Sequence, residues 1–370
     1  MHSGMIIIFV SIVQGILFLG HYVVYKTFVR YFNILEPSHL LWTRVVFIVL
    51  SISFILVSFL ASKYYGPLTK FLYTASAVWL GTLYWLFIAS ILAAIIFFVV
   101  NFFAPGKDID LIVRGMFVLA IIMSVYGIWN SNQVKVRQAT VHLENLPEQW
   151  RGRKLVLVAD THLGNVRNVN FAQKISGLIQ AQNPDMVLIA GDFYDGTPTE
   201  YTKLARVFGD IKSTYGVFFA PGNHEQFGDK SPFLNGLKEG GLKVLDNELV
   251  VVDGLQVAGI DYLTGTDSEN QRAVLRNMNI NPTVASILIK HVPNRIDISE
   301  EAGIGLQVSG HTHLGQVYPM SFITKQIFGK FHYGLNKLNK TQIYTTSGAG
   351  TWGPPQRVGT NSEIIVITLQ

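Results

Sequence analysis

Four long apolar stretches near the start of the chain constrain its fold more than any other feature. They run from Met5 to Val24, Leu40 to Ala61, Phe71 to Phe103 and Leu111 to Asn130. Each approaches or exceeds the roughly 20 residues that a helix needs to cross a bilayer. A helix satisfies its backbone hydrogen bonds within one segment, as hydrocarbon requires. The sequence therefore predicts a transmembrane domain of about four helices over residues 1–130.

The first and third stretches set limits on this domain. The first lacks a basic leading region and a small-residue cleavage site, and further spans follow it, so it is not a cleavable signal. The third is longer than one crossing requires, so it either tilts or extends beyond the hydrocarbon. Basic residues are balanced between the two ends of the spans, which leaves the orientation open. They are Lys63, Lys70, Lys135 and Arg137 on the terminal side, and Lys26, Arg30, Lys107, Arg44 and Arg114 on the other.

Composition separates the chain into two parts. Its 370 residues suffice for two domains. A mean hydropathy of +0.33 is too apolar for an ordinary soluble protein, whereas the chain from about Val134 onward has an ordinary soluble composition. The absence of cysteine excludes disulfides, thiolate zinc sites and cysteine nucleophiles. The net charge of +5 fits a membrane surface, and without basic runs interleaved with aromatics we expect no nucleic-acid partner.

From Lys154 onward the pattern changes to short β-rich runs that end in Gly, Asp, Asn or His. These runs are LVLVAD, MVLIAGD, GVFFAPGNH, LQVAGID, SILIKH and LQVSGHTH. Helical patterns lie between several of them, for example over Val169 to Ala181 and Thr199 to Ile211, which indicates α/β layering. Ligands bind at the carboxyl ends of strands in open α/β sheets, so the polar strand ends indicate a site.

Five polar clusters follow these runs. They are Asp160-Thr-His162, Gly191-Asp192, Gly222-Asn223-His224-Glu225, His291 and Gly310-His311-Thr-His313. Residues two apart share a face of an extended segment, so the first and last clusters each present two ligands to one side. Carboxylate, imidazole and amide oxygen together favour Mn, Fe or Zn over Ca or Mg. Any single cluster has an ordinary structural explanation, but five of the ten histidines fall within these clusters, and jointly that explanation fails.

The succession from Asp160 to His313 resembles the signature of calcineurin-like metallophosphoesterases: DxH, GDxxD, GNH(D/E), a lone His and GHxH. The resemblance implies a four-layer α/β/β/α sandwich over residues 151–370, joined to the transmembrane domain by a linker and first strand at 131–150. It also implies two divalent or trivalent metal ions, Mn, Fe or Zn. The implied ligands are Asp160, His162 and His313 for one ion, Asn223, His291 and His311 for the other, and Asp192 between the two.

The same resemblance implies roles for other residues. His224 is the unmetallated histidine that contacts the substrate phosphate and protonates the leaving oxygen. Asp195 completes GDxxD and orients a neighbouring side chain. Arg357 and Asn223 are the candidates for contact with an anionic substrate group. For Arg357 a surface or buried structural role is the alternative.

A narrower resemblance lies in GAGTWGPPQR at residues 348–357, in Glu363, and in Gly315-Gln316 after GHTH. This tail is similar to the membrane-associated subgroup that includes transmembrane proteins with a metallophosphoesterase domain. Enzymes related to that subgroup hydrolyse UDP-2,3-diacylglucosamine, an intermediate of lipid A synthesis. One departure is Leu314, which stands where the motif GHTHGGQ has glycine, and it affects loop geometry and substrate fit.

These observations predict a membrane-anchored hydrolase that cleaves a phosphate ester or pyrophosphate with metal-activated water. A tethered site meets amphiphilic molecules at high effective concentration, so we expect a lipid-linked substrate such as UDP-2,3-diacylglucosamine. Such a substrate implies a bacterial inner membrane with the catalytic domain on the cytoplasmic side. Simple anchoring is the alternative for the spans. A catalytically silent metal-binding scaffold, or a transporter or sensor regulated by the phosphoesterase, is the alternative for the whole chain.

Overall fold

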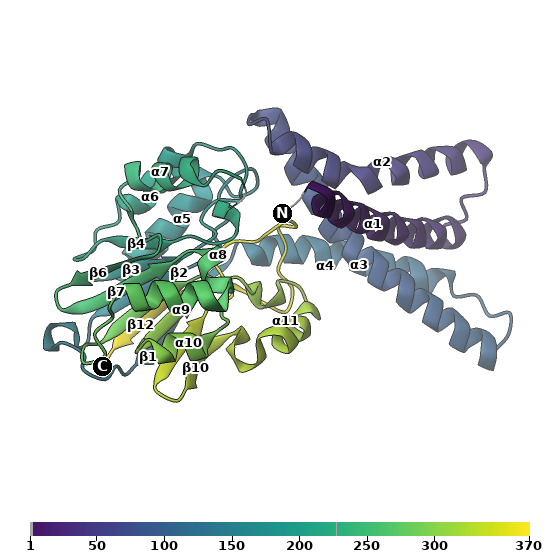
Figure 1. Ribbon diagram of the computed structural model, residues 1–370. Coiled ribbons are helices and arrows are strands. Elements are labelled where there is room, and N and C mark those ends of the chain that lie inside the picture. The colour runs from purple at the N-terminus through teal and green to yellow at the C-terminus, as the bar shows by residue number, and fades with distance from the viewer. Residues whose placement is uncertain (1–2, 227) are drawn as a thin grey trace. The chain divides into compact units, whose positions relative to one another are not determined.

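Two compact units make up the protein. The computed structural model describes residues 3–226 and 228–370. One unit comprises residues 1–129 with 353–356, and the other residues 130–352 with 357–370. The first unit is built from helices and the second contains two β-sheets (Figure 1).

Four long helices form the first unit: α1 (Ser3–Tyr31), α2 (Pro37–Ala61), α3 (Pro67–Phe103) and α4 (Asp110–Ser131). Each is long and apolar enough to cross a membrane, which confirms the prediction of four long apolar helices. Both α2 and α3 carry proline in the first turn. The backbone N–H groups of a first turn have no acceptor within the helix, so proline costs no hydrogen bond there. At 1.5 Å per residue, α3 is about 55 Å long, well beyond the roughly 30 Å of a hydrocarbon core. Helix α1 continues past the predicted end at Val24 to Tyr31.

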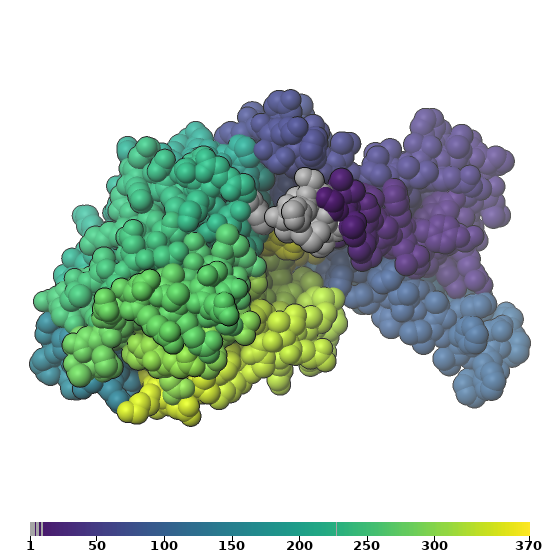
Figure 2. Space-filling model, viewed as in Figure 1, coloured from purple at the N-terminus to yellow at the C-terminus, as the bar shows by residue number. Residues whose placement is uncertain are grey.

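The outside of the helical unit is apolar. The unit, purple to blue in Figure 2, exposes large apolar side chains on all four helices, including Ile16, Leu41, Phe98 and Leu111. Soluble proteins rarely expose apolar patches of this extent. The surface therefore fits a lipid environment, and we treat the chain as a membrane protein.

The second unit holds two six-stranded sheets. The order of the first is β1-β12-β2-β3-β4-β5, and that of the second is β10-β11-β9-β8-β7-β6. The strands of the first are β1 (Val134–Val141), β12 (Ser362–Leu369), β2 (Lys154–Val158), β3 (Met186–Ala190), β4 (Val217–Ala220) and β5 (Lys243–Val244). Those of the second are β10 (Gly334–Leu338), β11 (Thr341–Thr345), β9 (Leu306–Ser309), β8 (Ser286–Lys290), β7 (Leu255–Ile260) and β6 (Glu248–Val252).

Helices cover the outer faces of both sheets (Figure 1). The first sheet is covered by α5 (Val169–Gln180), α6 (Tyr201–Gly209) and α7 (Ser231–Glu239), and the second by α9 (Ser268–Asn277) and α10 (Ile296–Glu301). The short helices α8 (Tyr262–Thr266) and α11 (Met320–Phe328) complete the unit. Along β2, Val156 and Val158 pack against the helices, whereas Leu155 and Leu157 face the other sheet. The predicted four-layer α/β/β/α sandwich is confirmed.

The sheet topology brings the motif loops to one edge. Strands β2, β3 and β4 are parallel neighbours in the first sheet, and β7, β8 and β9 are parallel neighbours in the second. Parallel neighbours end at the same edge of a sheet. The loops that follow β2, β3, β4, β8 and β9 carry all five polar clusters.

Candidate metal centre

The five clusters converge into two neighbouring groups of side chains. We name Asp160, His162 and His313 the Asp160 half-site, and Asn223, His291 and His311 the His291 half-site. Each half-site combines the two sheets: residues 160, 162 and 223 follow strands of the first, and residues 291, 311 and 313 follow strands of the second. Closing the two sheets into one sandwich therefore assembles both half-sites.

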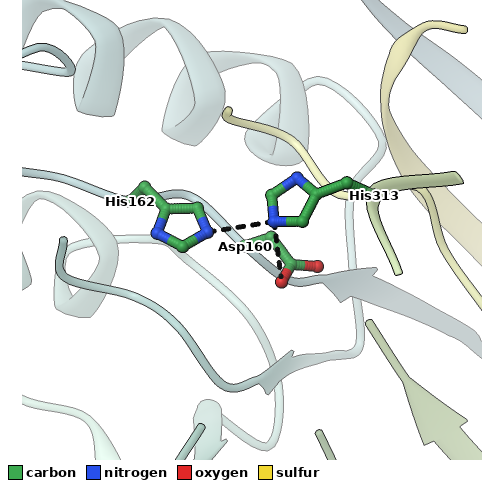
Figure 3. A group of neighbouring side chains, drawn as sticks. All are labelled: Asp160, His162 and His313. Atoms are coloured by element: carbon green, nitrogen blue, oxygen red, sulfur yellow. Dashed lines mark hydrogen bonds and ion pairs between the residues drawn. The ribbon is translucent and has the colours of Figure 1, made fainter. Parts of the chain in front are cut away.

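In the Asp160 half-site, three donor atoms lie close together (Figure 3). The Nε2 atoms of His162 and His313 are 3.1 Å apart, and His313 Nε2 lies 3.6 Å from Oδ1 of Asp160. The side chains of Asp160 and His162 are essentially inaccessible, whereas that of His313 is 13% exposed. These three residues have the donor atoms and spacing to hold one metal ion.

The His291 half-site is a tighter triangle. Oδ1 of Asn223 lies 3.1 Å from both His291 Nε2 and His311 Nδ1, and those two nitrogens are 3.2 Å apart. His291 Nδ1 donates to the backbone carbonyl of Ala190 over 2.7 Å. That bond fixes the ring tautomer and leaves the Nε2 lone pair directed at the half-site.

Asp192 lies between the half-sites. Its Oδ2 is 3.2 Å from His291 Nε2 and 3.8 Å from His162 Nε2. Its Oδ1 accepts a hydrogen bond from the backbone N–H of His224 over 2.9 Å. One carboxylate oxygen thus reaches both half-sites, which is the position that a bridging ligand requires.

The donor set fits a pair of transition-metal ions. Imidazole and carboxylate ligands lie about 2.0–2.2 Å from Zn, so neighbouring ligands of one ion are separated by about 3.0–3.4 Å. The separations of 3.1 and 3.2 Å among the donor atoms match that spacing. Four imidazoles, two carboxylates and an amide oxygen suit Mn, Fe or Zn.

Burial prepares most of the imidazoles for metal binding. It lowers the pKa of His162 and His313 well below the ordinary value and that of His311 to about 4, so these rings are neutral at neutral pH. Neutral imidazole is the form that binds metal. Burial alone lowers the pKa of His291 too, but the nearby Asp192 carboxylate raises it to about 9. Without metal, an ion pair between these two residues neutralises part of the site.

The backbone of the ligands is unusual. Five of them have φ in the left-handed region, a conformation that costs a non-glycine residue of order 1–3 kcal/mol and persists only where the surroundings impose it. They are Asp160 (φ 54°), His162 (46°), Asp192 (50°), His311 (70°) and His313 (48°). The glycines of the motifs belong to those surroundings. A Cβ on Gly222 or Gly310 would collide with the carboxylate of Asp192 or Asp160, respectively, which explains glycine at these positions.

His224 and Asp195 lie beside the Asp160 half-site. His224 Nδ1 donates to the backbone carbonyl of Asp195 over 3.0 Å, so its Nε2 points toward the site, 3.9 Å from Asp192 Oδ2. Burial alone lowers the pKa of His224, but Asp192 and Asp195 together raise it above the ordinary value. The Asp195 carboxylate lies 3.6 Å from His162 Nδ1, and burial raises its pKa to about 7.

Arg357 does not open onto the site. Its side chain is fully buried, and its guanidinium donates to the backbone carbonyls of His313 over 3.1 Å and Gly350 over 2.8 Å. Nη2 also lies 3.5 Å from His313 Nδ1. This placement corresponds to the buried structural alternative for Arg357. Asn223, the other substrate candidate, belongs to the His291 half-site.

Two residues of the site were missed by the sequence interpretation. Glu225 is fully buried, and its carboxylate accepts backbone N–H groups of Asp192, Tyr194 and Gly222, which ties two motif loops together. Trp352 is 56% exposed, with its ring 6.1 Å from that of His224. The sequence signals that could have identified them are the place of Glu225 in GNHE and that of Trp352 in GAGTW.

Comparison with known proteins agrees with this geometry. The family model for calcineurin-like phosphoesterases matches residues 153–315. A metallophosphoesterase of Campylobacter jejuni is 32% identical over 98% of both chains. One from Helicobacter pylori is 32% identical over 64% of each chain. A zebrafish (Danio rerio) transmembrane protein with metallophosphoesterase domain is 30% identical over 68% of this chain and 61% of its own.

Proposed function

The chain belongs to the calcineurin-like metallophosphoesterase family, and on that premise we propose that it hydrolyses a phosphate ester or pyrophosphate of a lipid-linked molecule at the membrane. The observation that carries the hydrolytic part is the convergence of seven donor residues from five loops, with Asp192 within reach of both half-sites. We assign these seven residues as the ligands of two metal ions.

The chemistry follows from this arrangement. When held by these residues, two cations would lower the pKa of water and supply positive charge to the phosphate oxygens. Asp192, which reaches both half-sites, would offset part of the positive charge held there. His224 holds a proton on Nε2, oriented by the bond from its Nδ1 to Asp195, and gives it to the departing oxygen. This route needs no covalent nucleophile.

Helix α11 supports the lipid part of the proposal. It follows the GHTH loop, and none of its nine residues, all of which the structure describes, is buried. Phe322, Ile323 and Ile327 are 58%, 50% and 66% exposed, and we name them the α11 patch. At the end of the helix, the Phe328 ring lies 6.1 Å from the ring of His311. An apolar surface that begins beside the metal centre suits the acyl chains of a substrate whose phosphate occupies the site.

The first experiment compares three substrates for the full chain in detergent with Mn²⁺. They are a UDP-diacylglucosamine-type lipid, an aryl phosphodiester and an aryl monoester, each beside Asp192→Ala. Metal-dependent cleavage of the lipid at far higher kcat/KM than the aryl esters, absent in the variant, supports the proposal. Turnover of the aryl esters alone contradicts the lipid part and leaves the spans as an anchor. No turnover with both metals bound favours the catalytically silent scaffold.

A matched pair of surface variants isolates the acyl contact. Ile327 in the α11 patch and Val251 on the edge strand β6 are both 66% exposed. Ile327→Ser should lower kcat/KM for the lipid substrate several-fold and leave the aryl esters unchanged, whereas Val251→Ser should change neither. Equal effects of the two variants contradict a role for α11 in holding acyl chains.

A UDP-linked lipid would place the catalytic unit in the cytoplasm, at the bacterial inner membrane. The chain has no cysteine, so one introduced at exposed Glu148 gives an unambiguous labelling site. In intact cells, a membrane-impermeant maleimide should fail to label Glu148→Cys until the membrane is opened. Labelling in intact cells contradicts the cytoplasmic placement.

A further inference from the structure

A cavity of about 950 Å³ opens among helices α1, α2 and α3 of the helical unit. It lies where α1 ends and α2 begins, between residues 22–31 of α1, residues 40–44 of α2 and residues 90–98 of α3. Helix α4 also begins at this end, since Arg114 donates to the backbone carbonyl of Tyr31. The cavity is therefore at the opposite end of the helices from Ser131, where α4 leads into β1.

Three cationic side chains line this cavity: Lys26, Arg30 and Arg44. No acidic residue lines it, and the ion pairs of the residues that the structure describes include none of these three cations. Arg114, at the same end, illustrates the contrast, because it pairs with Asp110 at 3.5 Å. Positive charge is thus concentrated in the cavity, and among the described residues no carboxylate forms an ion pair with it.

The rest of the lining is aromatic and apolar. Tyr22 and Tyr25 contribute phenol rings, and Phe97 and Phe98 come from the facing helix α3. The guanidinium of Arg30 lies over the Phe97 ring, 4.2 Å from its centroid. This cation–π contact holds the guanidinium beside the ring without using its N–H donors, which can bind an anion.

The position of Arg44 along α2 favours a bound anion. Arg44 is seven residues beyond the start of α2 at Pro37, which is about 10 Å along the helix axis. An uncompensated charge at such a depth is costly, so intramembrane cations are paired or reach a polar headgroup. Anionic lipid headgroups are the negative groups available at the surface of a membrane.

We propose that this cavity binds an anionic phospholipid. The phosphate lies among Lys26, Arg30 and Arg44, and the acyl chains lie along the phenylalanines of α3. The volume far exceeds what a free phosphate needs and is in the range that encloses an amphiphilic ligand. The site is distinct from the metal centre and does not depend on the proposed hydrolysis.

Native mass spectrometry of the full chain, released from detergent, tests the site directly. The probes are phosphatidylglycerol and zwitterionic phosphatidylcholine. The variant Arg30→Gln/Arg44→Gln should lower retention of phosphatidylglycerol about tenfold or more, since each cation near the surface contributes a factor of about five. Retention of phosphatidylcholine should stay unchanged.

Lys70→Gln is the matched control. Lys70 also lies 4.2 Å from the centroid of an aromatic ring, that of Tyr65, but it does not line the cavity. This variant should retain phosphatidylglycerol as the wild type does. Equal loss in the control and the double variant would assign the effect to general surface charge and overturn the site.

Two further arms complete the test. Excess inorganic phosphate should not displace phosphatidylglycerol; displacement at millimolar phosphate would make the ligand a free anion and overturn the lipid assignment. If the double variant does not fold, Lys26→Gln decides. Lys26 is exposed, so this substitution removes one positive charge with little effect on packing. It should weaken retention several-fold, and unchanged retention would overturn the proposal.

Discussion

The two half-sites use similar ligands but are held in different ways. In the His291 half-site the rings and the amide touch one another at 3.1–3.2 Å, and His291 rests on the backbone carbonyl of Ala190. In the Asp160 half-site the backbone N–H of His311 donates to the Asp160 carboxylate, whereas the two histidines are supported by side chains. His162 Nδ1 faces the carboxylate of Asp195 at 3.6 Å, and the guanidinium of Arg357 lies against His313.

This difference has a physical consequence. A backbone carbonyl at the end of a central strand moves only if the sheet moves, so the His291 half-site is fixed by the fold. Side chains such as Asp195 and Arg357 can be exchanged without breaking a strand. We therefore expect metal affinity to be adjustable at the Asp160 half-site and nearly fixed at the His291 half-site. The predictions below test that asymmetry and the position of Asp192 between the two.

The largest effect is expected for Asp192→Ala, because this residue reaches both half-sites. Hydrolysis of an aryl phosphodiester should fall by more than about 100-fold, beyond the usual cost of losing a residue behind a ligand. Metal analysis of the purified chain should show both ions weakened together. Loss of only one ion would show that Asp192 belongs to a single half-site and would contradict its assignment as a ligand shared by both. Asp195→Ala should reduce activity less.

The next effect concerns His224, which we assign to neither half-site although its Nε2 lies near Asp192. His224→Gln should lower kcat by about 10²–10⁴, the range for loss of a general acid, with metal content unchanged. The loss should be smaller for a p-nitrophenyl ester, whose leaving group needs little protonation, than for an alkyl ester. A drop in metal content would instead make His224 a ligand.

A smaller and one-sided effect is expected for Asp195→Asn, which keeps the shape of the side chain but removes the charge facing His162. Affinity for one of the two metal ions should fall by about 10–100-fold, while the other ion stays bound. Metal stoichiometry during titration with a chelator measures this. The control is Asp246→Asn, an aspartate of the same unit whose partner Lys230 lies at 2.7 Å. Equal weakening of both ions would remove the proposed asymmetry.

Sequence periodicity predicted the elements of the fold well, for reasons specific to each unit. Apolar length alone located α2 and α4, because hydrocarbon imposes one physical requirement along the whole helix. The end of α1 was placed too early, since Tyr25 and Lys26 lowered the local hydropathy without ending the helix. In the second unit, short β-rich runs with helical patterns between them indicated α/β layering, and the family resemblance supplied the two-sheet sandwich.

The site was predictable in its residue types and less so in its supports. The family motifs identified the sequence position of each candidate ligand, and the structure brings those residues together. Arg357 shows the limit of this reasoning, because a motif arginine has the same sequence signal whether it meets substrate or a set of buried carbonyls. Glu225 was missed for a related reason: its partners are three backbone N–H groups in two loops, and no side-chain pattern reports such contacts.

The smallest effect is expected for a change at Leu314, which stands where the motif GHTHGGQ has glycine. Leu314 follows His313 of the Asp160 half-site, and its φ of 51° and ψ of 32° lie in the left-handed region. A non-glycine residue there costs about 1–2 kcal/mol. Leu314→Gly removes that strain, but the greater freedom of glycine in the unfolded chain returns about 0.5–1 kcal/mol. The net gain in free energy of unfolding should be about 1 kcal/mol or less.

In a thermal melt of the full chain in detergent, that gain corresponds to a rise in Tm of about 1–3 °C for a unit of this size. Leu314→Ala is the control, because it keeps a Cβ in the same backbone conformation and should give no rise. A lower Tm for Leu314→Gly than for the wild type would mean that the half-buried leucine side chain contributes more through packing than its backbone costs. The loop that carries His313 would then be held by side-chain contacts even where strain is present, as the asymmetry between the half-sites implies.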